Sequence, residues 1–353
     1  LTPLSYIVAM LVGEREVSFR GEIMSASEAL SRLGLEPLKL RPKEALALMN
    51  GTSVATAIAS IALLRAKRIA RLASSITAMG SVAIHGNPSH FDSFIHEAKP
   101  HLGQAIAARW ILDDLGDEAK SKGARLQDRY SLRCAPHVSG VLVDALRFGE
   151  ETLETELNGV SDNPLVDVER GEILHGGNFY GGHVAFVADS LKLAVANIAC
   201  LLDRQLLLLC NPAENDGLPR DLVGVRGEGA CVHNGFKAVT IAASSLAAEA
   251  LKLTMPASAF SRGTELHNQD KVPMATIAAR DLLRIVEITE QVVAMLLLAS
   301  IQAVELRGRK IASERLSALA ASVRRVVPPL VEDRRMDLDI EAVLALLRGG
   351  DLP

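Results

Sequence analysis

Aromatic residues are scarce in this chain, and its cysteines form no recognisable pairs. Aromatic side chains make up 3% of the 353 residues, and the four cysteines include no CxxC spacing. Their apolar or glycine-rich surroundings indicate buried thiols in a reducing cytosol rather than a disulfide framework. We therefore expect a cytoplasmic protein without a zinc site. The four cysteines are Cys134, Cys200, Cys210 and Cys231.

The sequence also lacks an excess of charge of either sign. Its formal net charge is −4 at neutral pH, whereas nucleic acids and anionic membranes both select a basic face. The apolar run 292–304 is bracketed by Glu290 and Glu305, and it falls short of the roughly 20 residues that a bilayer span needs. We expect a soluble protein with neither a nucleic acid nor a membrane as its partner.

A histidine-based metal site is not expected either. His90, His96 and His101 lie near one another in the sequence, but Pro88 and Pro100 interrupt any shared helix. The spacing of the three histidines fits no usual metal triad. We therefore assign no residue of the chain as a metal ligand.

What the chain has instead is long helical periodicity. Apolar residues recur at three- and four-residue spacing in 54–64 and 142–153, as they do in amphipathic or buried helices. Residues 182–210 are apolar nearly all round, which is typical of a helix at the centre of a bundle. Further helices are predicted over 235–253 and 272–307, and the second of these is the longest uninterrupted helical pattern.

Strand signals are few. Residues 16–19 and 164–168 are each predicted to form part of a short ribbon, because a glycine-containing turn follows each of them. The length of the chain allows one large elongated helical domain or two compact ones. The predicted fold is all-α, with long antiparallel helices in a central bundle.

The segment 127–134 contains the densest group of functional side chains. Arg133 is a permanent cation whose planar fork suits a carboxylate. Tyr130 can donate or accept a proton, and Gln127 can orient either of these residues or a substrate carbonyl. The group predicts chemistry on a small carboxylic acid. The alternative for Arg133 is a surface cation beside Asp128.

Six short motifs follow one another along nearly the whole chain. They are Leu1-Thr2-Pro3-Leu4-Ser5, Leu48-Met49-Asn50-Gly51-Thr52, the segment 127–134, Glu156-Leu157-Asn158 with Ser161-Asp162-Asn163-Pro164, Gly176-Gly177-Asn178-Phe179, and His267-Asn268-Gln269-Asp270. Any one of them alone is weak evidence. Together, and in this order, they resemble the aromatic amino acid ammonia-lyase and aminomutase family.

The resemblance implies a fold, an assembly and a prosthetic group. The fold is the long-helix ammonia-lyase architecture, which is also fumarase- and aspartase-like, and the assembly is a homotetramer whose active sites combine residues from several subunits. Family members use an electrophilic 4-methylidene-imidazole-5-one (MIO), formed autocatalytically from an Ala-Ser-Gly tripeptide. That tripeptide lies just before the motif resembling Leu1-Thr2-Pro3-Leu4. We therefore expect residues 1–353 to form the central bundle and C-terminal helical part, with the segment carrying the tripeptide upstream of Leu1.

The resemblance also assigns catalytic roles. Arg133 would bind the substrate carboxylate in a bidentate salt bridge, and Tyr130 would assist proton movement beside the prosthetic group. Asn50 and Gln127 would hydrogen-bond the carbonyl oxygen of that group. For both amides the alternative is an ordinary capping or core hydrogen bond. Asn50 interrupts a helical pattern that resumes immediately, which favours its functional assignment.

Four further residues are expected to bind the substrate. Phe179 follows two glycines and an asparagine, so its ring can lie against an aromatic substrate, although it can also anchor a loop in the core. Gln269 lies where family members that act on histidine carry a glutamate. An amide cannot accept a proton as a carboxylate does, which favours a phenyl or hydroxyphenyl ring over imidazole; the alternative is a polar loop residue bonded to backbone. Asn178 and Asn268 are supporting residues.

The expected activity is that of an ammonia-lyase or a 2,3-aminomutase acting on an aromatic L-amino acid. Tyrosine is favoured and phenylalanine is next, because the segment 261–271 looks most similar to that of bacterial tyrosine aminomutases. One alternative is a histidine ammonia-lyase, which Gln269 opposes. Another is a catalytically inactive helical scaffold of the same fold. The ring selected, the choice between lyase and mutase, and the product stereochemistry stay open at this point.

Overall fold

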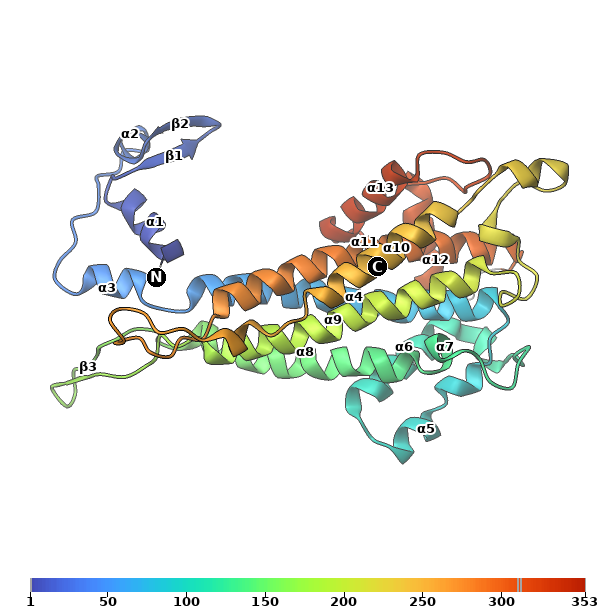
Figure 1. Ribbon diagram of the computed structural model, residues 1–353, viewed down its shortest axis with the longest axis horizontal. Helices are drawn as coiled ribbons and strands as arrows, with labels where there is room; N and C mark the ends of the chain where they lie inside the picture. Colours follow the sequence, from blue (N-terminus) through green and yellow to red (C-terminus); the bar gives the residue numbers. More distant parts are fainter. Residues whose placement is uncertain (1, 310, 312, 353) are drawn as a thin grey trace. The chain divides into compact units, whose positions relative to one another are not determined.

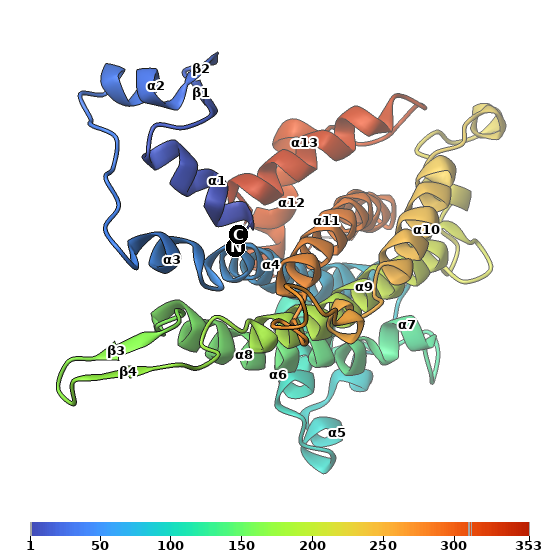
Figure 2. The same ribbon diagram turned by 60° about the vertical axis from the view of Figure 1, so that its left-hand side comes forward.

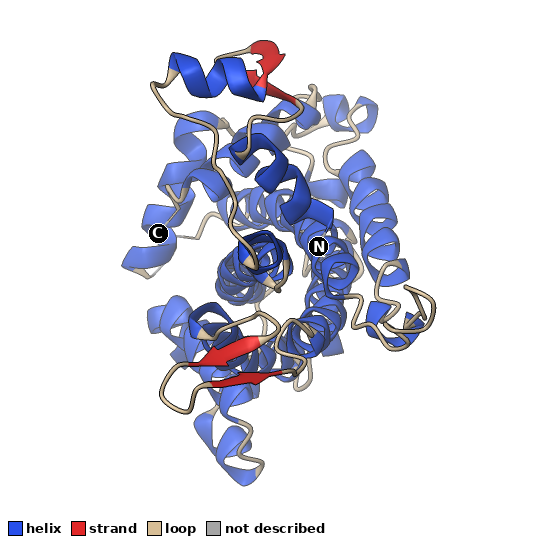
Figure 3. Cartoon of the chain, turned by 90° about the vertical axis from the view of Figure 1, so that its left-hand side faces the viewer, coloured by secondary structure: helices blue, strands red, loops and turns tan. Residues whose placement is uncertain are grey.

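The computed structural model describes residues 2–309, 311 and 313–352. Within that part of the chain helices dominate, and the sheets are two antiparallel hairpins (Figure 3). The predicted all-α fold is confirmed. The chain divides into two compact units: unit 1 comprises Leu1–Ser60, Glu150–Ala188 and Pro256–Arg280, and unit 2 comprises Ile61–Gly149, Asp189–Met255 and Asp281–Pro353.

Unit 2 is a bundle built mainly from long helices. Figures 1 and 2 both show the unit-2 parts of α9, α10 and α11 side by side. The long helices are α4 (Ser53–Ala83), α8 (Ala135–Asn158), α9 (Gly182–Cys210), α10 (Lys237–Lys252) and α11 (Ala275–Leu306), and α4, α8, α9 and α11 also contribute residues to unit 1. The shorter helices are α5 (Ser93–Ala98), α6 (Leu102–Leu115), α7 (Tyr130–Arg133), α12 (Glu314–Val326) and α13 (Met336–Gly349).

The helix boundaries follow local backbone chemistry. The helix predicted over 182–210 begins and ends at the predicted residues. The helix predicted from residue 272 begins instead at Ala275, because the residue before Pro273 is disfavoured in the helical conformation and Met274 adopts a left-handed φ of 59°. The helix predicted from residue 235 begins at Lys237, after a left-handed Gly235 with a φ of 54°.

Helix α9 is the core helix of unit 2. Its side chains at helical spacing, including Leu191, Val195, Ile198 and Leu202, are fully buried. By length and hydropathy alone, α9 and the stretch Glu44–Ala83 could cross a membrane. However, 72% of the most apolar stretch of α9 is buried within the protein. A helix that is apolar all round and covered by its neighbours is what the centre of a bundle requires.

One fully buried charged side chain of α9, that of Lys192, has anionic and carbonyl partners. The side chain of Lys192 is fully buried, and its Nζ lies 2.8 Å from Asp189 Oδ1 and 3.6 Å from Asp281 Oδ2. The same Nζ donates to the carbonyl oxygen of Met255 at 2.7 Å. An unpaired ammonium would be very unfavourable here, so these contacts tie α9 to the end of α10 and to α11.

Unit 1 contains both predicted ribbons. Strands β1 (Glu16–Phe19) and β2 (Glu22–Ser25) form the first, and β3 (Leu165–Asp167) and β4 (Glu172–Leu174) form the second. The first ribbon turns through Arg20 and Gly21, whose φ values of 53° and 88° suit a two-residue hairpin. The helices that lie wholly in this unit are α1 (Thr2–Leu11), α2 (Ala26–Arg32) and α3 (Glu44–Met49).

The cysteine prediction needs one correction. All four thiols are free, but only Cys210 is buried, and Cys134 and Cys200 are half-buried. Cys231 is exposed, so the prediction that it is buried is wrong. It lies in a short 3₁₀ turn (Glu228–Val232) and its Sγ donates to the carbonyl oxygen of Glu228 at 3.0 Å. The glycine-rich sequence around Cys231 favours a turn at the surface over a segment of the core.

Candidate active site

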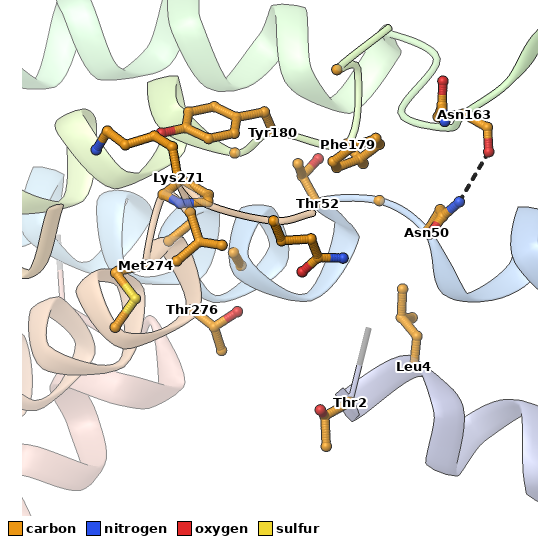
Figure 4. Close-up of a pocket in the computed structure, with 18 of the residues that line it drawn as sticks. Thr2, Leu4, Asn50, Thr52, Asn163, Phe179, Tyr180, Lys271, Met274 and Thr276 are labelled. Carbon is orange, nitrogen blue, oxygen red and sulfur yellow. Dashed lines mark hydrogen bonds between the residues drawn. The ribbon is translucent and has the colours of Figure 1, made fainter. Parts of the chain in front are cut away.

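Unit 1 contains a cavity of about 970 Å³. Its wall is made by four stretches that are far apart in the sequence: the first turn of α1, the junction between α3 and α4, the segment around the β3–β4 ribbon, and the loop that precedes α11 (Figure 4). Of the predicted site residues, the cavity is lined by Asn50, Phe179, Asn268 and Gln269.

Asn50 stands at the junction between α3 and α4. It ends α3 in an extended conformation, and the following Gly51 has a φ of 136°. A side chain at position 51 would come within 2.9 Å of the Ser161 backbone, so only glycine allows the two segments to approach this closely. The Asn50 Nδ2 donates to the carbonyl oxygen of Asn163 at 3.1 Å (Figure 4). The amide is thereby fixed in the cavity wall.

A lysine and a carboxylate strengthen this junction. Lys43 Nζ lies 2.6 Å from Asp162 Oδ2 and also donates to the carbonyl oxygen of Asn163 at 3.2 Å. The hydrogen bond from Lys43 is the main cause that lowers the pKa of Asp162 below its ordinary value. The Asn50 amide adds a longer bond to Asp162, at 3.4 Å. Asn50 therefore lies beside an ionised carboxylate.

Gln269 is positioned by a tight turn in the loop before α11. Its backbone pairs with Thr264 in both directions, and its Oε1 accepts from Thr264 Oγ1 at 3.2 Å. Between them Glu265, Leu266 and His267 all adopt left-handed φ values of 50°, 51° and 70°, which side chains rarely do. This turn returns the chain so that Asn268 and Gln269 reach the cavity wall.

Phe179 and Asn178 have different surroundings. The Phe179 side chain lines the cavity and its residue is 39% exposed, so it is not a loop anchor that fills the core. Asn178 instead donates from Nδ2 to the carbonyl oxygen of Val160 at 3.2 Å, and it is absent from the described part of the cavity wall. The bond holds the loop that carries Phe179. A role for Asn178 in substrate binding stays a prediction.

The sequence analysis gave no role to several residues in the cavity wall. Tyr180 follows Phe179 directly and is one of three tyrosines in the chain. The sequence signal for Tyr180 is its position directly after Phe179, the last residue of the motif. Thr52 donates to Glu156 Oε1 at 2.5 Å and so links the junction to α8. Further polar wall residues without an assigned role include His175, Glu265, Asp270 and Lys271.

Unit 2 brings together the other three predicted residues. The guanidinium carbon of Arg133 lies 4.6 Å from the centre of the Tyr130 ring, and Arg133 Nη2 donates to Gln127 Oε1 at 3.3 Å. Arg133 Nε donates to the backbone carbonyl of Asp128 at 3.1 Å. The carboxylate of Asp128 accepts instead from the backbone of Asn87 at 2.6 Å. Within the part of the chain that the structure describes, no acidic side chain forms an ion pair with Arg133.

Helix α9 holds the backbone of the segment that carries Tyr130 and Arg133 through a hydrogen bond. Gln205 is buried in α9, and its Nε2 donates to the carbonyl oxygen of Ser131 at 2.8 Å and to Thr77 Oγ1 at 2.9 Å. Leu132 points into the core with 2% exposure. Tyr130, by contrast, is 72% exposed. The anchor fixes the backbone while leaving the phenol accessible.

Glu214 forms ion pairs with two arginines close to the same segment. Arg125 Nη1 and Arg129 Nη2 lie 2.7 and 2.6 Å from its two carboxylate oxygens. The hydrogen bond from Arg129, followed by that from Arg125, lowers the pKa of Glu214 from 4.5 to about 2. Because the pKa in the folded state is below that of the unfolded chain, the pair stabilises the fold above about pH 4.5, and this stabilisation is lost as the pH falls towards 2.

Replacing Glu214 with glutamine should therefore weaken the fold at neutral pH and flatten its acid dependence. The expected loss is on the order of 1 kcal/mol at pH 7, because one partner is exposed, and it should shrink as the pH falls. Urea unfolding at several pH values measures both effects. The matched control is Glu332→Gln, an exposed glutamate in the same unit. An acid dependence as steep in Glu214→Gln as in the unaltered protein would contradict the prediction.

The predicted site residues thus form two groups that belong to different units of the chain. Asn50, Phe179, Asn268 and Gln269 share the cavity of unit 1, and Gln127, Tyr130 and Arg133 share the α7 segment of unit 2.

Known proteins resemble the chain in both sequence and structure. Residues 1–325 match the family described as "Aromatic amino acid lyase". A histidine ammonia-lyase of Geobacillus thermodenitrificans is 41% identical over 99% of this chain and 69% of the relative. The crystal structure of histidine ammonia-lyase from Trypanosoma cruzi has a TM-score of 0.91 at 34% identity, covering all of this chain and 67% of that one. Tyrosine aminomutase from Streptomyces globisporus has a TM-score of 0.91 at 35% identity, covering all of this chain and 70% of that one.

The family match spans most of the chain, and the similar structures cover all of it. The sequence motifs that line the cavity and form the α7 segment lie within the matched residues. The chain belongs to the aromatic amino acid lyase family, and the relatives that it resembles are ammonia-lyase and aminomutase enzymes.

Proposed function

We propose that the chain acts on an aromatic L-amino acid with a hydroxyphenyl or phenyl ring, with tyrosine favoured and phenylalanine next. Gln269 in the cavity wall is the observation that carries this choice. Its side chain is a neutral amide whose oxygen already accepts from Thr264, so it cannot take up a proton from an imidazole as a carboxylate would. Phe179 offers an accessible ring in the same wall, which suits stacking or edge contact with an aryl substrate.

Arg133 is proposed to bind the substrate carboxylate. Its guanidinium is held by the Asp128 carbonyl and by Gln127, yet it keeps its charge available for a ligand. A bidentate contact with a carboxylate would fix the two reacting carbons and reduce the entropy lost in reaching the transition state. Tyr130 lies against the same guanidinium, and its phenol is proposed to hold or move a proton at the substrate amine or carbon.

The residues in the cavity wall are compatible with the MIO group that the family implies. The Asn50 amide shares the wall with Thr2, Pro3 and Leu4 of α1 (Figure 4). Asn50 and Gln127 are proposed to hold the group through its carbonyl oxygen. The group would supply an electrophilic carbon for the substrate amine.

Exposed apolar side chains support the proposal of a homotetramer with shared active sites. Along the unit-2 helices, Ile61, Leu64, Leu193 and Ile241 are each more than half exposed. Apolar residues gathered on long helices favour burial against another surface. Residues from a second copy would then complete the site, and light scattering with the intact protein measures the assembly directly.

A second candidate function is histidine ammonia-lyase. The observation that favours it is the identity of 36–41% with four histidine ammonia-lyases, each matched over nearly all of this chain. The two candidates differ in the ring and not in the elimination chemistry. They are therefore separable by the substrate alone.

Turnover of tyrosine, phenylalanine and histidine by the intact protein tests the proposal. Formation of the arylacrylate is followed by ultraviolet absorbance, and chiral chromatography separates a β-amino acid product. The near-ultraviolet spectrum and the polypeptide mass report whether the tripeptide has dehydrated and cyclised. Turnover of histidine to urocanate without turnover of tyrosine would refute the choice of ring. Absence of turnover with an intact tripeptide-derived group would support an inactive scaffold.

Exchanging Gln269 for glutamate should shift the ring preference towards histidine. We expect the ratio of kcat/KM for histidine to that for tyrosine to rise by about 10-fold or more, which corresponds to roughly 1.4 kcal/mol. The matched control is Asn268→Asp, which adds the same charge to the adjacent wall position. Equal shifts in both variants would mean that charge in the cavity, and not the group at position 269, decides the preference.

A further inference from the structure

Two adjoining cavities of unit 2 share one arginine, Arg68 of α4. The first, of about 290 Å³, is lined by Arg65, Arg68, Glu287 and Arg348. The second, of about 240 Å³, is lined by Arg68, Arg71, Leu72, Arg315, Leu347, Gly350 and Leu352. Their walls are made by residues of α4, α11, α12 and α13 and of the segment after α13. Figure 2 shows α12 and α13 next to each other.

Two buried carboxylates form ion pairs with four of these arginines. Glu290 is fully buried and accepts from Arg65 at 2.6 and 2.7 Å and from Arg348 at 3.0 Å. Asp114, with its side chain 1% exposed, accepts from Arg71 at 2.7 and 2.8 Å and from Arg315 at 3.1 Å. Each carboxylate is therefore shared between two guanidiniums.

The clusters carry more positive than negative charge. Glu287 adds a third carboxylate, but its Oε1 is 3.9 Å from Arg65 and its Oε2 is 3.9 Å from Arg284. Arg68 donates to the carbonyl oxygen of Leu347 at 3.3 Å, and no acidic side chain in the described part of the chain pairs with it. Among the described residues, the five arginines that line the two cavities are matched by three carboxylates that form ion pairs with them.

The protonated guanidinium of Arg315 is destabilised by its surroundings. Burial lowers the pKa of Arg315, and the charge of Arg71 adds to this effect, although Asp114 opposes it. A partly desolvated guanidinium whose pKa falls is stabilised by any further anion that approaches it. The cavity beside it has room for one, because Gly350 has no side chain and ends α13 in a left-handed conformation with a φ of 80°.

We propose that the cavity lined by Arg68, Arg71 and Arg315 binds a small oxyanion, either inorganic phosphate or an organic carboxylate. Planar guanidinium forks match the paired oxygens of both groups. Arg68 supplies a guanidinium that pairs with no carboxylate among the described residues, and Leu72, Leu347 and Leu352 form an apolar wall beside it. The bound anion would join α4 to α12 and α13, so it would stabilise the packing of the C-terminal helices as well as occupy the site.

Calorimetric titration of the intact protein tests the proposal, with inorganic phosphate and benzoate as probes. Sodium chloride keeps the ionic strength constant, which removes general screening. We expect saturable binding of at least one probe and a rise in the unfolding temperature with its concentration. Tighter binding of phosphate would identify a mineral oxyanion, and tighter binding of benzoate would identify an organic carboxylate with an apolar group.

Arg68 is the decisive position, because its removal leaves Asp114 and Glu290 fully paired. Arg68→Ala is expected to raise the Kd by about 10-fold or more. Arg68→Gln keeps a donor for the Leu347 carbonyl and is the second variant, in case alanine impairs folding. The matched control is Arg226→Ala, which removes the same charge from an exposed loop of unit 2 and should bind as the unaltered protein does. Absence of saturable binding to the intact protein, or a Kd in both Arg68 variants equal to that of the unaltered protein, would overturn the proposal.

Discussion

Replacing Arg133 with alanine is expected to lower kcat/KM roughly 30- to 5,000-fold, which corresponds to a loss of transition-state stabilisation on the order of 2 to 5 kcal/mol. The proposed cause is loss of the bidentate grip on the substrate carboxylate. Arg133 makes one bond to the Asp128 carbonyl and one to Gln127, so its removal should change the unfolding temperature little. Steady-state kinetics with tyrosine, together with thermal unfolding, measure the two effects separately.

Two variants separate positioning from charge in this experiment. Arg133→Lys keeps the cation but not the fork, and it should recover only part of the lost activity. Arg129→Ala is the matched control, because Arg129 lies in the same segment and its partner Glu214 keeps a second arginine, Arg125. Unchanged kinetics in Arg133→Ala would remove this residue from the site. An equal loss in Arg129→Ala would point to damage to the α7 segment as a whole.

Replacing Lys192 with methionine should be the most damaging single change to the fold. The substitution leaves the Asp189 carboxylate in a buried position without its closest cation, and it removes the donor to the Met255 carbonyl. Loss of one partner from a buried pair is expected to cost about 3 kcal/mol. Denaturant unfolding measures the free energy, and the result should appear as a lower midpoint with an unchanged slope.

A double substitution tests the reason for that loss. Lys192→Met combined with Asp189→Leu removes both buried charges, and it should recover part of the stability because neither ion then has to be desolvated. Lys252→Met is the control, since that lysine is exposed at the end of α10. If the double variant is as unstable as the sum of its single substitutions, the buried ion pair does not explain the effect.

Much of the fold follows from local sequence patterns. The helix over 182–210 was predictable at both ends, because its apolar periodicity is unbroken and glycines precede it. The ribbon that begins at Glu16 was predictable from the turn at Arg20 and Gly21. The burial of Lys192 was not predictable, since its partner Asp281 is distant in the sequence and the pairing depends on how α9 meets α11.

Sequence motifs suggested the candidate site residues, but they did not predict the geometry around them. In the structure, Asn50 and Gln269 lie in one cavity wall, and Arg133 lies beside Tyr130. The motifs gave no sign of the ion pair between Lys43 and Asp162, or of the left-handed turn that positions Gln269, because both depend on backbone conformations and contacts between remote segments. Roles for these residues in substrate binding stay predictions.

The hydrogen bond from Gln205 to the Ser131 carbonyl has a consequence for how activity can be altered. We expect mutations in the interior of a structural helix to shift the surface that carries Tyr130 and Arg133, whose side chains are proposed to contact the substrate. Searches for altered specificity would then do well to randomise Gln205 and Thr77 as a pair, since interior hydrogen-bond partners offer an evolutionary route that screens of pocket residues alone would miss.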